Sequence, residues 1–311
     1  MPKFIMLVGL PASGKSTLAE KLKEKYKAEV ISSDSLRKEL YNDEQNQEHN
    51  HEIFNEMLKR TIAYLKEGKN VIYDATNISS KRRINVCSQV SKYADEKICY
   101  LLTTSYELCI KRNNERERKV PDEAIKRMLY NFNTPSIYEG FTKVIVVHSD
   151  EQKKLAEEVV DEKMQHDNPN HTASVAEHMS KVRREVGKYS YNILKMFYPK
   201  DEEFEAWKDS CLLTFAAYYH DIGKFYTKSF DEKKIAHFYS HENVGAYIIF
   251  NMEIANSLTD EELLDVSLLV NWHMRPYFWK TEKEKEKARL FLGKRLFTLL
   301  MILHLFDETA D

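Results

Sequence analysis

Cysteines are few in this sequence, and none has the spacing of a metal or redox motif. The four cysteines among the 311 residues are Cys87, Cys99, Cys109 and Cys211. They form no C-x-x-C pair and no zinc-finger pattern, which argues against a structural zinc site built from thiolates and fits a reducing compartment. We therefore expect these thiols to belong to the core.

Long apolar runs are also absent, and no segment has the length and hydrophobicity needed to span a bilayer. From Lys3 the chain enters a strand-like run and a glycine loop, without the three zones of a signal peptide. The expectation is a cytoplasmic protein that does not contact membranes.

Positive charge is not in excess, since the formal net charge is -2 and the pI is near 6.6. General nucleic-acid binders carry a broadly basic surface. The composition excludes that class, and any contact with nucleic acid has to be local.

The length exceeds the usual size of one hydrophobic core, so two domains are expected. In the first half, apolar runs alternate with helical patterns, which predicts a parallel sheet covered by helices. From His171 onward the apolar spacing is almost entirely helical. The predicted fold is an α/β domain over residues 1–165, followed by an all-α domain over residues 166–311, with the polar segment QHDNPN as a linker or boundary.

Individual elements follow from the same patterns. Strands are expected at the runs FIMLV, AEVISSD, KNVIYDAT, KICYLLT and KVIVVHS. In the first half, helices are expected at residues 16–27, 50–68, 106–130 and 150–164. In the second half, helices are expected at residues 174–196, 203–221, 240–256, 260–272 and 289–308.

A glycine loop after the first strand satisfies the pattern G-x-x-x-x-G-K-S. Its glycines let backbone amides turn toward phosphates, and the start of the following helix adds positive potential. The sequence has no N-K-x-D tetrapeptide for reading guanine, which argues against a GTPase. We predict a site for ATP and Mg²⁺, formed by Gly9, Ser13, Gly14, Lys15, Ser16 and Thr17.

An acid and an arginine follow the second strand. Asp34 and Arg37 share a face if a helix begins there. The carboxylate would accept a proton from an attacking hydroxyl, and the arginine would steady the transferred phosphoryl group. The alternative is that Asp34 only caps the helix, and the pattern taken alone favours this cap.

The ordered set GLPASGKST, SSDSLR, YDATN followed by two arginines, and RNNERERKVPDEAIKRM resembles the kinase domain of 5′-hydroxyl polynucleotide kinases and their zeta-toxin-like relatives. The resemblance covers roughly residues 1–150. It implies that Asp34 is the general base and that Arg37 contacts the phosphate near the accepting hydroxyl. It also implies that Asp74 supports magnesium through water. The acceptor stays open, since small-molecule kinases share this framework.

The same resemblance implies that Arg116 lies on a lid over the donor phosphates, in an arginine-rich segment that includes Arg112 and Arg118. The segment also contains several glutamates. Its alternative interpretation is a solvated helix face with salt bridges.

The second half contains a set of histidines and aspartates. His220 and Asp221 end an apolar helical run, and Ser174-x-x-Glu177 predicts a capping box that places His178 in the first turns of a helix. Imidazole and carboxylate together suit divalent ions such as Mn²⁺, Ni²⁺, Co²⁺ or Zn²⁺, and bridging ligands allow two ions. Such a site supports hydrolysis at phosphorus. Taken individually, each histidine is more simply explained as a satisfied core or surface residue.

As a set, HTASVAEHMSKV, HDIGK, HFYSHENVGA, NWHMRP and LFDETAD resemble the HD phosphohydrolase superfamily over about residues 168–311. The local resemblance is to HD domains of bacterial CCA-adding enzymes and of polynucleotide end-healing proteins. It implies that Lys224 contacts phosphate. It implies a first metal held by His178, His220, Asp221 and Asp307, and a second metal or the substrate phosphate held by His241 and His273. His171, His237 and His304 have no assigned role.

The two resemblances together imply repair of broken nucleic acid. A break that leaves a 5′-hydroxyl and a 2′,3′-cyclic phosphate or phosphomonoester must gain phosphate at one end and lose it at the other. We therefore predict a bifunctional end-healing enzyme acting on nucleic-acid ends, with RNA favoured and a separate ligase as a partner. Known end-healing proteins join these domains in the opposite order.

Two alternatives stay open. One is a small-molecule or nucleoside kinase fused to an HD nucleotide phosphohydrolase. The other is a nucleotide-gated binding or signalling protein.

Overall fold

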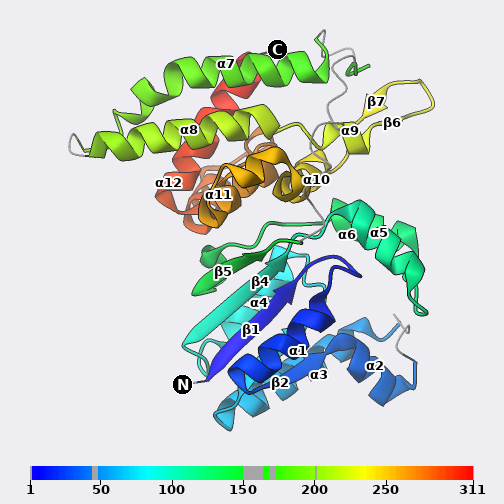
Figure 1. Ribbon diagram of the computed structural model, residues 1–311. Coiled ribbons are helices and arrows are strands. Elements are labelled where there is room, and N and C mark those ends of the chain that lie inside the picture. The colour runs from blue at the N-terminus through cyan, green and yellow to red at the C-terminus, as the bar shows by residue number, and fades with distance from the viewer. Residues whose placement is uncertain (1, 44–47, 150–163, 168–172, 200–201, 311) are drawn as a thin grey trace. The chain divides into compact units, whose positions relative to one another are not determined.

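The computed structural model describes residues 2–43, 48–149, 164–167, 173–199 and 202–310 (Figure 1). Its contacts divide the chain into two compact units. The first comprises Met1–Met128 and Pro135–Gln152, and the second comprises Leu129–Thr134 and Lys153–Asp311. The division between domains at residues 165 and 166 stays a prediction.

The first unit is built on a five-stranded parallel sheet with the strand order β2-β3-β1-β4-β5. The strands are β1 (Lys3–Val8), β2 (Ala28–Ser32), β3 (Asn70–Asp74), β4 (Glu96–Leu102) and β5 (Lys143–Val147). All five predicted strands are thereby confirmed. Residues 4–8 of the central strand β1 are fully buried, as a strand covered on both faces requires.

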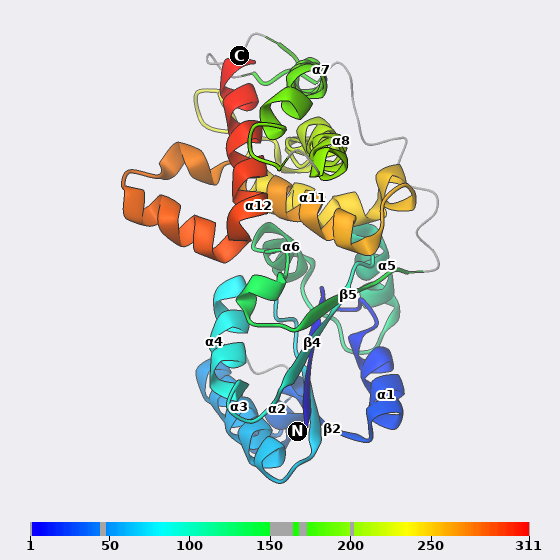
Figure 2. The same ribbon diagram turned by 90° about the vertical axis from the view of Figure 1, so that its left-hand side faces the viewer.

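Helices flank both faces of this sheet, with α1 on one side and α3 and α4 on the other (Figure 2). The helices of the first unit are α1 (Lys15–Tyr26), α2 (Ser33–Tyr41), α3 (Asn50–Lys66), α4 (Ser80–Val90), α5 (Tyr106–Glu115) and most of α6 (Asp122–Tyr130), with a 3₁₀ turn η1 (Ile137–Glu139). The α/β prediction for this region is confirmed.

The prediction of one helical stretch over residues 106–130 is wrong, because the structure breaks it between α5 and α6. Pro121 cannot donate the backbone hydrogen bond that a continuous helix needs. The side chain of Asn113 also holds Val120, accepting from its N–H at 2.9 Å and donating to its carbonyl at 2.8 Å. The arginine-rich segment between the helices is therefore a loop.

The second unit is mainly helical and matches the predicted all-α class. Its helices are α7 (Val175–Leu194), α8 (Glu203–Tyr219), α9 (Lys224–Thr227), α10 (His241–Ile248), α11 (Asp260–Trp272) and α12 (Glu282–Thr309). Helix α7 packs along α8, and α10 packs against α11. The predicted capping box is present, since Ser174 Oγ accepts from Glu177 N–H and the Glu177 carboxylate accepts from Ser174 N–H.

Several boundaries differ from the predictions. The helix expected at residues 240–256 ends at Ile248 and continues as the 3₁₀ turns η3 (Ile249–Asn251) and η4 (Glu253–Asn256). Helix α12 begins at Glu282, before the expected residue 289, and contains a break at Gly293, where φ is 72°. The small hairpin β6 (Ser229–Phe230) and β7 (Ala236–His237) was not expected.

A third 3₁₀ turn of the second unit is η5 (Arg275–Phe278). Most of the helix expected at residues 150–164 lies outside the described residues. Among the described helices, none has the length and hydrophobicity to cross a bilayer.

The turn after α8 approaches the start of α10 so closely that only glycine fits. A Cβ atom on Gly223 would lie 2.0 Å from the carbonyl oxygen of His241 and 2.7 Å from the backbone nitrogen of Gly245. The φ of Gly223 is -66°, so the requirement is space and not backbone conformation. This contact brings the residues just before Gly223 against the first turn of α10.

We expect Gly223→Ala to lower the free energy of unfolding of the second unit by about 3 kcal/mol or more, because the added methyl group meets backbone atoms that cannot move aside. The matched control is Gly187→Ala in α7, where the Cβ atom would lie 3.8 Å from Thr214. Alanine in the middle of a helix should stabilise by about 0.5–1 kcal/mol.

Urea unfolding followed by tryptophan fluorescence measures both variants. The three tryptophans, Trp207, Trp272 and Trp279, all lie in the second unit, so the signal reports on that unit alone. Equal midpoints for the two variants would contradict the close approach at Gly223.

Candidate active sites

The glycine loop between β1 and α1 has the geometry of a phosphate cradle. Gly14 has a φ of 95°, a left-handed conformation that residues with a side chain rarely adopt, and it precedes α1 directly. Lys15 folds back over the loop and donates to the carbonyl oxygens of Gly9 at 3.1 Å and Leu10 at 2.6 Å. Ser16 and Thr17 lie exposed in the first turn of α1.

Asp74 lies at the end of β3, in register with Leu7 of β1 and Ser32 of β2. Burial raises the pKa of this carboxyl group, and the nearby Lys15 opposes that rise. Burial lowers the pKa of Lys15, while the charge of Asp74 opposes that shift. The acid and the lysine therefore face the same space at the ends of the strands, as support of a magnesium ion beside the phosphates requires.

Asp34 is not a helix cap, and that alternative is wrong. The N-cap of α2 is Ser32, and Asp34 lies within the first turn of the helix. Its two carboxylate oxygens accept from Arg37 Nη1 at 2.9 Å and from Arg118 Nη1 at 2.8 Å. The carboxylate side chain is half-exposed, whereas Arg37 is buried.

The Nε atoms of Arg37 and Arg116 are buried and have no hydrogen-bond partner among the described residues. Arg37 Nη2 donates to Asn50 Oδ1 at 2.7 Å, and Arg116 Nη2 donates to Asn113 Oδ1 at 2.7 Å. Burial lowers the pKa of both guanidinium groups, and the charge of Arg118 lowers each further.

The predicted lid segment is thus not a solvated helix face. Arg116 and Arg118 belong to the loop after α5, and Arg118 reaches Asp34 across the unit. Arg112 lies in the last turn of α5. The structure brings Arg118 to the predicted general base, which the sequence alone did not specify.

The two arginines after YDATN have different environments. Arg83 is fully buried and pairs with the carboxylate of Glu139 through Nε at 2.6 Å and Nη2 at 2.7 Å, so it belongs to the interior of the unit. Arg82 stacks on the ring of Phe54 with 3.7 Å between the guanidinium carbon and the ring centre. Burial lowers the pKa of Arg82, and the charge of Arg37 lowers it further, so Arg82 adds positive charge near Arg37.

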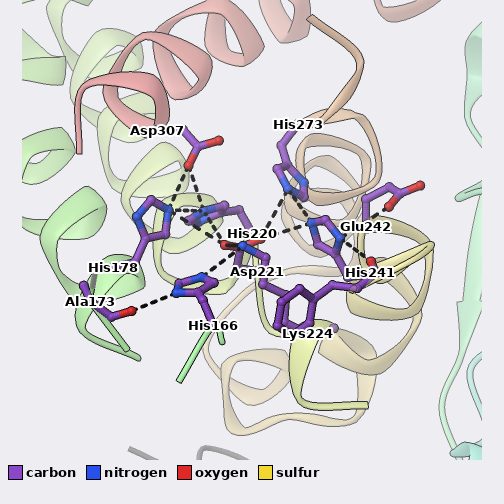
Figure 3. A network of polar contacts seen from close by, with 12 residues as sticks. His166, Ala173, His178, His220, Asp221, Lys224, His241, Glu242, His273 and Asp307 are labelled. Atoms are coloured by element: carbon purple, nitrogen blue, oxygen red, sulfur yellow. Dashed lines mark hydrogen bonds and ion pairs between the residues drawn. The ribbon is translucent and has the colours of Figure 1, made fainter. Parts of the chain in front are cut away.

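In the second unit, six predicted ligands meet in one buried cluster (Figure 3). They come from α7, from the turn after α8, from the first turn of α10, from the residue after α11 and from the last turns of α12. They are His178, His220, Asp221, His241, His273 and Asp307.

These ligands form two groups that share Asp221. In one group, the Nε2 atoms of His178 and His220 lie 3.3 Å apart, and Asp307 Oδ1 lies 3.0 Å and 3.1 Å from them. In the other, the Nε2 atoms of His241 and His273 lie 3.1 Å apart. Asp221 Oδ1 lies 3.1 Å from His241 Nε2, and Asp221 Oδ2 lies 3.4 Å from His220 Nε2.

In three of the histidines, the hydrogen bond made by Nδ1 determines which nitrogen is available to bind a metal ion. In His220, Nδ1 lies 2.8 Å from the carbonyl oxygen of Ala217. In His241, Nδ1 lies 2.8 Å from the carbonyl oxygen of Phe238, and in His273 it lies 2.7 Å from that of Val270. A carbonyl only accepts, so Nδ1 carries a proton in each ring, and the Nε2 atoms, which converge in the cluster, are the nitrogens left to bind a metal ion. A divalent cation between them fits this donor set, with Asp221 as the bridge.

Without a metal ion, the carboxylates of the cluster favour a proton in its place on His220. Burial disfavours a charged imidazole, but Asp221 and Asp307 outweigh it and raise the pKa of His220 to about 10. Burial also disfavours a charged Asp221, yet Lys224 and His220 hold the pKa of that carboxyl group well below its usual range. The cluster therefore attracts positive charge where the Nε2 atoms converge.

Two of the unassigned histidines lie in other contacts. His237 Nε2 lies 3.3 Å from Asp231 Oδ2, and its ring stacks on Tyr239. His304 packs edge-on against Tyr277, with 4.5 Å between ring centres. His171 lies outside the described residues.

Two residues of the site were missed. Tyr277 donates to Asp307 Oδ2 at 3.0 Å. This bond orients the carboxylate so that its other oxygen, Oδ1, faces His178 and His220. His166 lies beside Lys224, with 3.2 Å between Nε2 and Nζ. The polar residues around His166 predict a linker. Its place shortly before the first helix of the second unit is the one feature of the sequence that points toward the site.

Comparisons with known proteins agree with both folds. A family described as AAA domain matches residues 4–135, and a family described as HD domain matches residues 169–310. The chain therefore contains a P-loop domain of the kinase type and an HD domain.

Two curated relatives are similar to the first region. The L-seryl-tRNA(Sec) kinase of Methanococcus maripaludis is 30% identical over 138 residues, which cover 42% of this chain and 52% of that protein. The bifunctional polynucleotide phosphatase/kinase of Schizosaccharomyces pombe is 27% identical over 147 residues, which cover 46% of this chain and 32% of that protein. The chain thus spans about half or less of the length of these relatives.

Similar solved structures include a chain of a Pnkp1/Rnl/Hen1 RNA repair complex, 26% identical with a TM-score of 0.38, in which the match covers 42% of this chain and 43% of the other. A fungal RNA kinase is 13% identical with a TM-score of 0.36, covering 68% of this chain and 49% of the other.

We expect Asp221→Ala to abolish binding of both metal ions, because one carboxylate oxygen faces each group of ligands. His273→Ala should remove only the ion of its own group. The measurement is metal content after loading with Mn²⁺ and desalting. His237→Ala, which changes a histidine outside the cluster, is the matched control and should keep the wild-type stoichiometry. Undiminished metal in Asp221→Ala would refute the bridging role.

In chelator-treated protein, the stability of the second unit should fall as the pH rises from neutral toward about 10. The folded-state pKa of His220, about 10, lies above the ordinary value of 6.5. Its protonated ring therefore contributes stability that is fully present below the unfolded pKa and is lost as the pH rises through the folded pKa. Urea midpoints across this range measure the effect. His220→Asn should flatten the slope, and an unchanged slope in that variant would assign the pH dependence to other groups.

Proposed function

We propose that this chain heals broken nucleic-acid ends, by phosphorylating a 5′-hydroxyl from ATP in the first unit and removing a 2′,3′-cyclic phosphate or phosphomonoester in the second. The observation that carries the proposal is the presence in one chain of a phosphate-binding loop and of a buried cluster of candidate metal ligands. Lys15 and Asp34 belong to the P-loop domain, and the bridged histidine cluster belongs to the HD domain.

The first reaction transfers a phosphoryl group to an alcohol. The half-exposed carboxylate of Asp34 accepts the proton of the hydroxyl as its oxygen bonds to the γ-phosphorus of ATP, and the bond to ADP breaks. Arg37 and Arg118 hold the carboxylate in place. Lys15 and Arg116 offset negative charge on the donor phosphates, while Ser16 and Asp74 would hold magnesium, which neutralises that charge further.

The charge around Asp34 favours an anionic acceptor. Arg37 and Arg118 each donate to this carboxylate, and the guanidinium of Arg82 is close enough to Arg37 to feel its charge. A nucleic-acid end brings phosphodiesters next to the accepting hydroxyl, which such charges would bind. The names of both curated relatives refer to nucleic-acid-borne acceptors, a seryl-tRNA and a polynucleotide.

The second reaction hydrolyses a phosphoester. The six clustered ligands would hold one or two divalent ions, which supply an acidified water and neutralise phosphate charge. Lys224, with its ammonium 2.6 Å from Asp221 Oδ2, adds a further positive charge for the phosphoryl oxygens.

A second candidate is a kinase for a hydroxyl on an aminoacylated tRNA. The similarity to L-seryl-tRNA(Sec) kinase favours it specifically. A seryl-tRNA substrate therefore belongs in the same assay, together with free nucleosides.

The test uses radiolabelled ATP, Mg²⁺ and a 5′-hydroxyl RNA that ends in a 2′,3′-cyclic phosphate, with and without Mn²⁺, and follows both ends. We expect label at the 5′ end and loss of the 3′-terminal phosphate. Asp34→Asn should reduce the transfer by a factor of about 10²–10⁴ and spare the hydrolysis. Asp221→Ala should do the reverse, so each variant is the folding control for the other.

Three outcomes would decide against the proposal. Labelling of a nucleoside without labelling of any oligonucleotide would support the small-molecule kinase. Labelling of seryl-tRNA alone would support the second candidate. ATP binding without turnover of any acceptor would support a nucleotide-gated binding protein.

A further inference from the structure

His166 lies on a short segment that is fixed to the second unit from both sides. The N–H of Val175 donates to the carbonyl of Met164 at 3.0 Å, and the N–H of Ala236 donates to the carbonyl of Asp167 at 3.0 Å. Lys228 Nζ donates to the carbonyl of Gln165 at 2.6 Å. The imidazole of His166 is 1% exposed, so this polar segment carries a buried ring into the interior.

The ring of His166 has a defined orientation (Figure 3). Its Nδ1 atom lies 2.8 Å from the carbonyl oxygen of Ala173, which can only accept, so Nδ1 carries the proton. Nε2 is then an acceptor, and it lies 3.2 Å from the ammonium of Lys224. The backbone just before α7 thus selects the tautomer that binds a lysine.

Lys224 is held between two acceptors of different kinds. Its Nζ lies 2.6 Å from Asp221 Oδ2 and 3.2 Å from His166 Nε2. The ring of Phe238 lies 5.6 Å from the same ammonium. A lysine side chain has four flexible bonds, so two fixed acceptors and a ring determine where its charge lies.

The position of this ammonium matters because Asp221 Oδ2 also faces the imidazoles of His178 and His220. An ammonium that is free to move would bind the carboxylate from several directions and would compete with an ion for its lone pairs. Because it is bound by His166 as well as by Asp221, the ammonium has a fixed place beside the cluster, where phosphoryl oxygens of a substrate would be bound.

We propose that His166 is a positioning residue that holds the ammonium of Lys224 at the edge of the ligand cluster, where it binds a phosphoryl oxygen of the substrate. This inference rests on the proposed phosphoester hydrolysis of the second unit. It assigns His166 a role in phosphate affinity and none in holding the metal.

The test measures binding of inorganic phosphate to the full chain loaded with Mn²⁺, by calorimetric titration, and so does not depend on turnover. We expect His166→Ala to weaken phosphate binding about tenfold, equivalent to about 1.4 kcal/mol, with unchanged manganese content. His166→Gln places an amide oxygen toward Lys224 and should recover most of the affinity. His237→Ala is the matched control and should bind phosphate as the wild type does.

A double-mutant cycle separates positioning from simple anchoring of the segment. If His166 acts through Lys224, the variant with both His166→Ala and Lys224→Ala should bind phosphate no more weakly than Lys224→Ala alone. If His166 only anchors the segment, the two losses should add. Urea midpoints from tryptophan fluorescence show whether each variant is folded, and His166→Gln supplies the comparison if the alanine variant is not.

Wild-type affinity in His166→Ala, additive losses in the double variant, or loss of manganese in His166→Ala would each overturn the inference. A wild-type protein that holds manganese and binds no phosphate would instead contradict the proposed function of the second unit, and with it the premise of this inference.

Discussion

The ligand cluster of the second unit depends on the contacts that the carboxylate of Asp221 makes with the histidines on both sides of it. One of its oxygens faces His241 and His273, and the other faces His178, His220 and Lys224. Such a contact is possible only if the turn after α8 presses against α10, and Gly223 permits that approach by lacking a side chain. The metal ligand Asp221 and the packing residue Gly223 therefore both require the turn after α8 to lie close against α10.

The first unit uses a carboxylate in the opposite way. Asp34 is half-exposed and bound by Arg37 and Arg118, whereas Asp221 is buried and surrounded by imidazoles. An exposed carboxylate among guanidinium groups can receive the end of a large polyanion. A buried carboxylate among imidazoles is suited to holding a small cation. The different environments of the two acids thus match the two reactions proposed for the chain.

The sequence predicted what is local and left open what is not. Buried parallel strands appear as continuous apolar runs, and a P-loop has fixed spacing, so β1 and Lys15 could be placed. Contacts between distant residues gave no such signal. Pro121 marks the break before α6 in the sequence, but the bonds of Asn113 to Val120 and of Arg118 to Asp34 depend on the fold. Likewise, nothing in QHDNPN indicates that backbone contacts on both sides bury one of its residues.

The chain path through the two units has a consequence for dissecting the protein. Leu129–Thr134 belongs to the second unit although residues on both sides belong to the first. Its buried Phe132 packs edge-on against Tyr247 at 5.0 Å, and Thr134 Oγ1 lies 2.6 Å from Ser267 Oγ. A fragment that starts after residue 165 would leave Tyr247 without this aromatic neighbour and Ser267 without this hydroxyl partner. No single cleavage of the polypeptide can therefore yield both halves with their native interiors.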